Sequence, residues 1–529
     1  MTSSKVIGVV GSGFSSLACV SKLVLKDSIK IIILDNGKEP IDSSYKLKED
    51  IKNKNSYIER LKTYYDFIKK NKVHNSSNIN KTFFGSSIFN EEHLVQNKYK
   101  LYSSNAYGGF SNVWGGVSNA PIIENLHDWP IKYNDLSVYF STIAKILNLS
   151  GESDNLSTFL KFNYENQYGI KLSPIVKEWY SRINNKIHNL NKDDIYVGRS
   201  KLSLNNNLLN KQYCKECGMC MHGCPHDIIF NSRLGFSNIL SNDKISYYNN
   251  YKVIKFKESN NKIQLFCNNT KTNNIEKFSF DYIFLAAGCI NSSKIVINSI
   301  KELYNKSITI DQNDNYIAPF LVKKIKSFPL KFEKNTLAQL SVIINDKNID
   351  KHGVYFQTYE FSDIVLFNIF NKLSYNYFYH SILKNFPMIN RLLFAQFIFN
   401  SKVSNQLVMK LINDNFSIDV INNVNDTNNT LKKIINKLDS NINLNIRFIP
   451  FFTKKFKTGM SYHVGSSFKM KKNNSLFSTD LIGRPYKFNK ISIVDSSILP
   501  SLPANSHTFL TMANCYRITD EIVKKEFMP

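Results

Sequence analysis

The chain has 529 residues, of which 43% are hydrophobic and 13% are aromatic. This composition can fill a large core and excludes a mainly disordered chain, and the length suits several domains or one large enzyme with an inserted lobe. The formal net charge is +26, from 68 Lys and Arg against 42 Asp and Glu. The lysines are dispersed and accompany no nucleic-acid-binding module, so the charge predicts no nucleic-acid partner.

Targeting signals and cysteine usage suggest a compartment. Residues 1–5 lead directly into an apolar strand without a signal peptide, and the sequence contains no run of 18 apolar residues that could cross a membrane. Of the eight cysteines, four lie within eleven residues, at 214–224. This distribution is typical of a metal or redox site in a reducing compartment. We therefore expect a cytoplasmic protein, which could also lie peripherally at the inner face of the membrane.

The chain opens as strand, helix and strand. Residues 5–11 and 29–34 are apolar runs typical of buried parallel strands, and residues 14–25 carry apolar side chains at helical spacing. Helical segments are expected at about 46–72 and at 134–149. Further along the chain, a glycine-rich stretch lies at 106–121, alternating strands are expected at about 245–284, and a less regular lobe spans 320–450. The last 65 residues return to strand, turn and helix.

The first strand ends in a dinucleotide-binding pattern. Gly11 and Gly13 would let the backbone turn tightly and approach a pyrophosphate at the helix N-terminus, where Ser15 and Ser16 form the first turn. Asp35 closes the second strand, where a carboxylate can accept hydrogen bonds from ribose hydroxyls. This pattern alone does not separate NAD from FAD. The alternative is a glycine-rich turn that binds no ligand.

Segments spread over the whole chain resemble the glucose–methanol–choline (GMC) flavoprotein oxidoreductases, in a subgroup with a ferredoxin-like cysteine cluster. They are Asp35-Asn-Gly37, the glycine loop from Gly108 to Gly116, Asp128-Trp-Pro-Ile131, Ala286-Ala-Gly-Cys-Ile-Asn291, Tyr462-His463 through Met470, and Ile493 through Pro500. The resemblance implies an α/β fold like that of GMC enzymes and glutathione reductase. Its Rossmann-like FAD-binding domain would be assembled from N- and C-terminal segments, with an inserted α+β substrate domain.

The resemblance also implies domain limits. The FAD-binding domain would comprise residues 1–45, 100–125, 226–320 and 455–529. The substrate-binding or cap lobe would comprise residues 46–99, 126–213 and 321–454, and residues 214–225 would form a cysteine loop.

FAD would then lie along residues from several segments. Its pyrophosphate would lie at Gly11 and Gly13 and its ribose at Asp35, while Gly288 and Asp495 would close the site. The loop along the flavin would contribute Gly108, Gly109, Ser111, Asn112, Trp114 and Gly115. Some family members attach FAD through a histidine in this loop, but none lies between Gly108 and Gly116. We therefore expect non-covalent FAD.

The resemblance places one catalytic base at His463, in the C-terminal signature, because an imidazole has a pKa near the working pH. The alternative is a structural core histidine. A second catalytic residue, usually His or Asn, falls at Ser506 in strict register, with Asn505 and His507 on either side. We favour His507, with Asn505 as the next candidate. His507 could instead only stabilise the turn.

The cysteine loop has the spacing of a bacterial ferredoxin. Cys214, Cys217, Cys220 and Cys224 form a C-x₂-C-x₂-C-x₃-C-P run, which predicts an iron–sulfur cluster, preferably [4Fe–4S]. Because no second run is present, Cys224 would bind the same cluster or leave a three-iron one. Zinc bound by four thiolates and free structural thiols are the alternatives.

These features together predict an FAD-dependent dehydrogenase that oxidises the CH–OH group of an alcohol, sugar or polyol. Its electrons would pass through the cluster to an acceptor protein or a quinone. The alternatives are an oxidase that uses O₂ and has a structural cysteine turn, and a non-catalytic FAD electron-transfer subunit. The aromatic stretch from Phe361 to Phe399 could lie at a membrane interface, but we favour the alternative that it forms a core or lid of the substrate lobe.

Overall fold

A computed structural model describes residues 4–39, 42–70, 89–90, 101–164, 169–206, 213–326, 333–362, 389–412, 415–424, 426–505 and 507–527. Its first layer is a parallel sheet in the order β23-β12-β1-β2-β8. The strands are β1 (Lys5–Val10), β2 (Ile29–Leu34), β8 (Ile245–Tyr248), β12 (Tyr282–Leu285) and β23 (Ile491–Ile493). The sheet thus joins strands from the start, middle and end of the chain. Its central strands are continuous apolar runs because both faces are covered.

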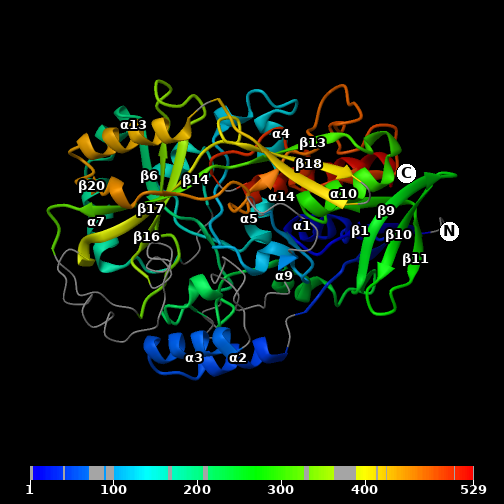
Figure 1. Ribbon diagram of the computed structural model, residues 1–529, viewed down its shortest axis with the longest axis horizontal. Helices are drawn as coiled ribbons and strands as arrows, with labels where there is room; N and C mark the ends of the chain where they lie inside the picture. The colour runs from blue at the N-terminus through cyan, green and yellow to red at the C-terminus, as the bar shows by residue number, and fades with distance from the viewer. Residues whose placement is uncertain are drawn as a thin grey trace.

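Helices cover this sheet and bring the two ends of the chain together (Figure 1). α1 (Phe14–Leu23) follows β1 and packs against the C-terminal helix α14 (His507–Glu526). The Cys515 thiol of α14 lies 3.1 Å from the backbone oxygen of Ser15. α9 (Ser232–Ile239) also contacts α1, and α10 (Cys289–Ser299) follows β12. The middle of the C-terminal helix therefore packs against the first turn of α1.

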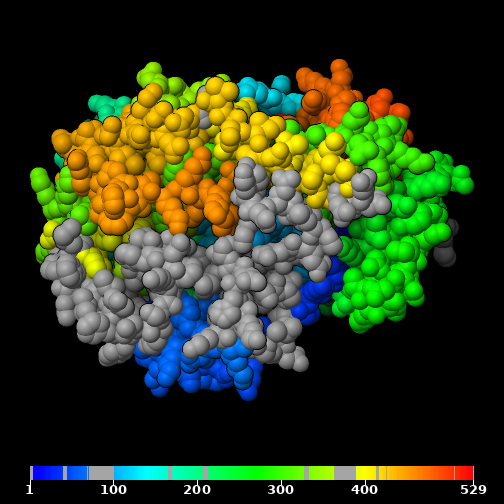
Figure 2. All heavy atoms as spheres, viewed as in Figure 1, coloured from blue at the N-terminus to red at the C-terminus, as the bar shows by residue number. Residues whose placement is uncertain are grey.

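An antiparallel sheet in the order β11-β10-β9 forms one end of the molecule, drawn in green on the right of Figures 1 and 2. Its strands are β9 (Tyr251–Ser259), β10 (Lys262–Asn269) and β11 (Ile275–Phe280). Exposed and half-buried side chains alternate along β11, as expected for a sheet with one face in water. The chain then enters β12 of the parallel sheet directly.

A large, mainly antiparallel sheet lies at the opposite end (Figure 1). Its order is β20-β14-β17-β16-β15-β6, and β21 also pairs with β14. The strands are β6 (Ile195–Arg199), β14 (Asn315–Val322), β15 (Leu340–Ile344), β16 (Val354–Glu360), β17 (Leu392–Ile398), β20 (Ile446–Phe448) and β21 (Lys454–Lys455). One face packs with α7 (Pro174–Asn184) and α13 (Thr427–Ser440) in a separate apolar core.

The remaining elements connect these layers. A smaller sheet in the order β19-β18-β13-β22 runs between the two larger ones, and α2 and α3 form an outlying pair (Figure 1). The bounds are α2 (Asp42–Lys52), α3 (Tyr57–Lys70), β3 (Phe89–Asn90), β4 (Ser103–Ser104), β5 (Leu149–Ser150), α6 (Asn155–Phe159), α8 (Ile187–Lys192), β7 (Leu202–Ser203), β13 (Ser307–Gln312), β18 (Gln406–Ile412), β19 (Asn415–Ile421) and β22 (Val464–Gly465).

The expected strand, helix and strand at the N-terminus are confirmed by β1, α1 and β2, and the strands expected at 245–284 by β8 to β12. The single helix expected at 134–149 is wrong, since it divides into α4 (Tyr133–Ser137) and α5 (Phe140–Ile146). Tyr139 leaves ideal helical geometry at the junction, and its hydroxyl donates to Asp520. The domain limits given above stay a prediction.

The aromatic stretch at 361–399 lies partly outside the described residues, which omit 363–388. Its described part includes β17, whose side chains are mostly buried in the large sheet. Among the helices of the described residues, none is both long enough and apolar enough to cross a bilayer.

Candidate active site

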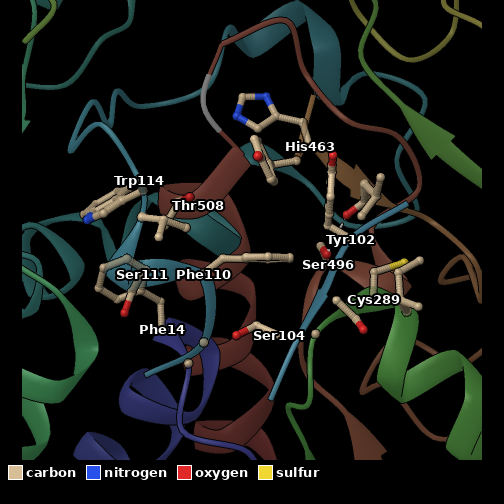
Figure 3. A pocket seen from close by; sticks show the side chains of 18 of the residues that line it. Phe14, Tyr102, Ser104, Phe110, Ser111, Trp114, Cys289, His463, Ser496 and Thr508 are labelled. Carbon is tan, nitrogen blue, oxygen red and sulfur yellow. Dashed lines mark hydrogen bonds between the residues drawn. The ribbon is translucent and has the colours of Figure 1, made fainter. Parts of the chain in front are cut away.

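A cavity of about 1070 Å³ lies at the carboxyl ends of the parallel strands and extends to the large sheet. Val10, Leu34 and Ala286 line it where β1, β2 and β12 end. The carboxyl edge is where open α/β sheets bind ligands. Figure 3 shows His463 near the top of the pocket and Phe14 and Ser104 near the bottom. The volume is at the upper end of the usual range for one drug-sized ligand, so the space suits a large ligand.

The turn after β1 forms one end of the cavity. Gly11 has φ +96°, and a Cβ there would lie 2.7 Å from the Ala286 carbonyl oxygen, so the close approach of β12 requires glycine. Gly13 is the N-cap of α1 and, like Ser15, lines the cavity. A Cβ at Gly13 would have no atom of the described chain within 4 Å. The helix N-terminus therefore opens onto empty space that an anion could occupy.

Asp35 lies at the end of β2 and lines the same cavity. Ser12 Oγ donates to its carboxylate, and Tyr247 Oη donates to it over 3.0 Å. Burial nevertheless raises the pKa of Asp35 to about 6, because these hydrogen bonds only partly offset the loss of water. Ser12 and Tyr247 were missing from the sequence prediction. Ser12 lies between the two glycines of the turn, but Tyr247 is 212 positions away from Asp35 and carries no local signal.

The 108–116 loop lies against this turn. The Gly108 N–H donates to Ser12 Oγ over 2.8 Å, and Trp114 Nε1 donates to the Phe230 carbonyl over 2.7 Å. Among the loop residues predicted to bind the cofactor, Gly109, Ser111, Trp114 and Gly115 line the cavity. Gly108 and Asn112 hold the loop in shape instead, the latter by donating to the backbone oxygens of Tyr107 and Gly109 over 2.8 and 2.9 Å.

Gly288 and Asp495 meet on the other side of the cavity, and both line it. The Asp495 carboxylate accepts from the Gly288 N–H over 2.9 Å and from the hydroxyls of Ser292 and Ser497. Burial raises the pKa of Asp495, and these donors oppose that shift. Asp495 thus fixes the start of α10, which begins directly after Gly288. Ser16, by contrast, is buried in α1 away from the cavity lining.

Two histidines from distant parts of the sequence meet in the cavity. His463 precedes β22 and His507 begins α14, and their ring centroids are 4.9 Å apart with the planes at 80°. Burial, together with repulsion from His463, lowers the pKa of His507 to about 3. His507 is therefore neutral near pH 7 and keeps a nitrogen lone pair. The pair can accept a proton and orient a hydroxyl group.

Asn505 and Ser506 were the other candidates for the second catalytic residue. Asn505 is fully buried, its Nδ2 donates to the Ala120 carbonyl, and it does not line the cavity. Ser506 lies outside the described residues. The structure thus brings His507, not Asn505, next to His463.

An aromatic group that the sequence prediction missed accompanies the histidines. Tyr462 stacks with Tyr102 at 5.2 Å and meets Phe110 edge-on at 5.8 Å, and all three line the cavity. Tyr462 has φ +58°, a conformation that is rare for a bulky residue and that clusters at active sites. Only Phe110 and Tyr462 lie within the motifs already singled out, next to Gly109 and His463.

The cysteine loop packs beneath the 108–116 loop. Cys220 and Cys224 share a second, small cavity with Ser111 and Trp114. Burial is the main cause that raises the pKa of all four thiols in the loop, and the charges of Cys224, Cys217 and Cys214 add to the shift at Cys220. In the part of the chain described here, no group of three or more His, Cys, Asp or Glu side chains is placed to hold a metal ion. The predicted cluster therefore has no support from this arrangement.

No protein-family model matches the sequence, and no curated protein matches it. Among solved structures, the chain is similar to the crystal structure of pyridoxine 4-oxidase from Mesorbium loti, with a TM-score of 0.60. The two chains are 11% identical, and the alignment covers 97% of this chain and 98% of the other. The chain shares the fold of that enzyme. At this identity the likeness shows the fold alone.

Proposed function

We propose that the protein is an FAD-dependent oxidoreductase of the GMC type that oxidises a CH–OH group. The observation that carries the proposal is the pair His463–His507, which opens into the same cavity as the turn after β1. An arrangement that combines a dinucleotide cradle with a proton acceptor suits removal of hydrogen from an alcohol. The shared fold with an enzyme named as an oxidase of pyridoxine supports this class of reaction.

The residues fit FAD. The empty space beside Gly13 and at the N-terminus of α1 is a cradle for a pyrophosphate, and the Asp35 carboxylate lies where ribose hydroxyls would follow. Gly115 and Gly288 also have no atom of the described chain within 4 Å of a built Cβ, which leaves room for a flat ring system. Since no histidine lies in the 108–116 loop, the cofactor would be held without a covalent bond.

FAD, when bound, would supply the acceptor for the hydride that leaves the carbinol carbon. His463 would take the hydroxyl proton, so that the alcohol loses one hydride and one proton and becomes a carbonyl compound. His507 stays neutral because of its low pKa and would hold the substrate oxygen in place. The aromatic side chains of Tyr102 and Tyr462 would exclude water from this end of the cavity.

The test is a spectrum of the purified protein before and after an alcohol is added without oxygen. We expect flavin absorption that the alcohol bleaches and that an artificial electron acceptor restores. Acid precipitation should release the flavin into the supernatant. Protein that contains FAD but is bleached by no alcohol in a broad panel would favour the non-catalytic electron-transfer subunit, and protein without FAD would refute the proposal.

We also propose that the cysteine loop holds an iron–sulfur cluster that passes electrons from the flavin to an acceptor protein or a quinone. The ferredoxin spacing carries this proposal. The backbone N–H groups of Ile228 and Thr336 donate to Cys224 Sγ over 3.3 Å and to Cys220 Sγ over 3.5 Å, and such bonds would stabilise thiolates that bind a cluster. Among the described residues the thiols are not grouped as metal ligands, so assembly would have to draw them together. The raised thiol pKa values mean that assembly must release protons.

Iron and acid-labile sulfide are to be measured after anaerobic purification. We expect the stoichiometry of one [4Fe–4S] cluster per chain, an EPR signal on reduction, and loss of both in Cys220→Ser. Cys267→Ser is the matched control, because Cys267 is a buried free thiol in β10, outside the loop. If the wild-type protein contains no iron and reduces O₂ directly, the cluster proposal is wrong and the alternative of an oxidase is favoured.

A further inference from the structure

The wall of the cavity formed by the large sheet carries several polar side chains beside Ile317 and Ile398, whereas the opposite face of the same sheet is apolar. Tyr355, Gln357 and Tyr359 alternate along β16 and line the cavity. Val354 and Phe356, between and beside them, belong to the apolar core on the other face. A sheet that only had to close a core would not need hydrogen-bonding groups here, since burial of such groups is unfavourable unless they are paired.

Gln396 of β17 lies directly opposite Gln357 and also lines the cavity. Gln357 Nε2 donates to Tyr359 Oη over 2.7 Å and to Gln396 Oε1 over 3.0 Å, and Tyr359 Oη donates to Gln396 Oε1 over 3.3 Å. These bonds hold the amides and phenols in a fixed array. A fixed array of donors and acceptors can recognise hydroxyl groups without ordering itself first.

Two further polar groups on the same wall have unsatisfied oxygens. Asn315 and Thr336 are 2% and 5% exposed and line the cavity, and Asn315 Oδ1 and Thr336 Oγ1 have no hydrogen-bond partner in the described chain. Buried polar atoms are nearly always hydrogen-bonded in folded proteins. Within the described residues, both atoms are therefore available for a hydrogen bond with a molecule that enters the cavity.

This wall also adjoins the catalytic pair. The N–H of Asn313, two residues before Asn315, donates to the His463 carbonyl over 3.4 Å. The polar wall and the histidines are thus parts of one continuous cavity. A substrate whose reacting carbon lies at His463 would extend along this wall.

We propose that the substrate carries several hydroxyl groups, as a sugar or a polyol does; this inference rests on the proposed function. Each hydroxyl can both donate and accept, so it can satisfy Asn315 Oδ1, Thr336 Oγ1 and the free positions of Gln396. An unbranched alkyl alcohol would displace water from these groups and replace none of the lost hydrogen bonds. Sites built to bind hydroxyl groups reject analogues that lack them.

The test compares D-glucitol with 1-hexanol, two six-carbon alcohols, in anaerobic flavin reduction by the holoenzyme. We expect the second-order rate constant to be at least about 100-fold higher for D-glucitol. Thr336→Val and Gln396→Leu should each lower the constant for D-glucitol by about 10-fold and should raise that for 1-hexanol, because they remove polar groups that 1-hexanol leaves without hydrogen bonds. Tyr316→Phe is the control, because Tyr316 lies on the apolar face of the same sheet.

Equal or faster reduction by 1-hexanol would overturn the inference while the proposed function stands. If neither alcohol reduces the flavin, calorimetric titration of the holoenzyme decides the inference independently of turnover. If D-glucitol binds and Gln396→Leu weakens that binding, the inference about the substrate is supported. The absence of flavin reduction would then be due to the chemical step and not to binding. Binding of 1-hexanol alone, or of neither compound, would count against it.

Discussion

Replacing His463 by alanine is expected to slow flavin reduction by alcohol by about 10²- to 10⁴-fold, the usual contribution of a positioned general base. His463 lies 4.9 Å from His507 between ring centroids and lines the cavity, whereas the Asp35 carboxylate is held by Ser12 and Tyr247. The variant should therefore keep its FAD. Stopped-flow absorbance measures the reduction rate, and the flavin-to-protein absorbance ratio measures occupancy.

The control is His127→Ala, since His127 is an exposed histidine outside the cavity. It should reduce its flavin at the wild-type rate. The His463→Ala variant has a second signature, because it removes the repulsion that helps to lower the pKa of His507. That pKa should move upward, which NMR titration of the imidazole can detect. Unchanged flavin reduction in His463→Ala would show that the two histidines are structural.

The dinucleotide turn could be predicted from sequence because its determinants are local. Gly11 and Gly13 follow a buried strand and open a helix. The backbone of Gly11, at φ +96°, requires glycine, whereas Gly13 leaves open space at the start of α1. His463 was found for a different reason, as part of a signature that resembles a known family. Both kinds of signal lie within a few consecutive residues.

The rest of the site depends on contacts between distant segments. Tyr247 meets Asp35 through the pairing of β2 with β8, and Gln357 meets Gln396 through the register of β16 with β17. Neither strand pairing can be predicted from the residues next to Tyr247 or Gln357 in the sequence. The choice among Asn505, Ser506 and His507 likewise depends on where α14 begins, and the ends of helices are the least predictable part of a sequence pattern.

The substitution Gly13→Thr is expected to lower FAD affinity by about 10- to 100-fold and to leave the apoprotein almost as stable as the wild type. Gly13 has φ −74° and ψ −174°, which suit a threonine, and the two residues are similar as N-caps. The added Cβ has no atom of the described chain within 4 Å, and the side chain would extend into the space proposed for the pyrophosphate. Steric crowding by extra atoms costs about 1–3 kcal/mol of binding free energy, which corresponds to the expected loss of FAD affinity.

Gly11→Ala separates this effect from a general weakening of the fold. At φ +96° an alanine is strained, and its Cβ would lie 2.7 Å from the Ala286 carbonyl oxygen, so β12 would have to move. The apoprotein of Gly11→Ala should therefore unfold at a lower urea concentration than that of Gly13→Thr. Fluorescence titration with FAD measures affinity in both. If Gly13→Thr binds FAD as tightly as the wild type, the pyrophosphate does not lie at the N-terminus of α1, because the added side chain would weaken the binding of a phosphate there.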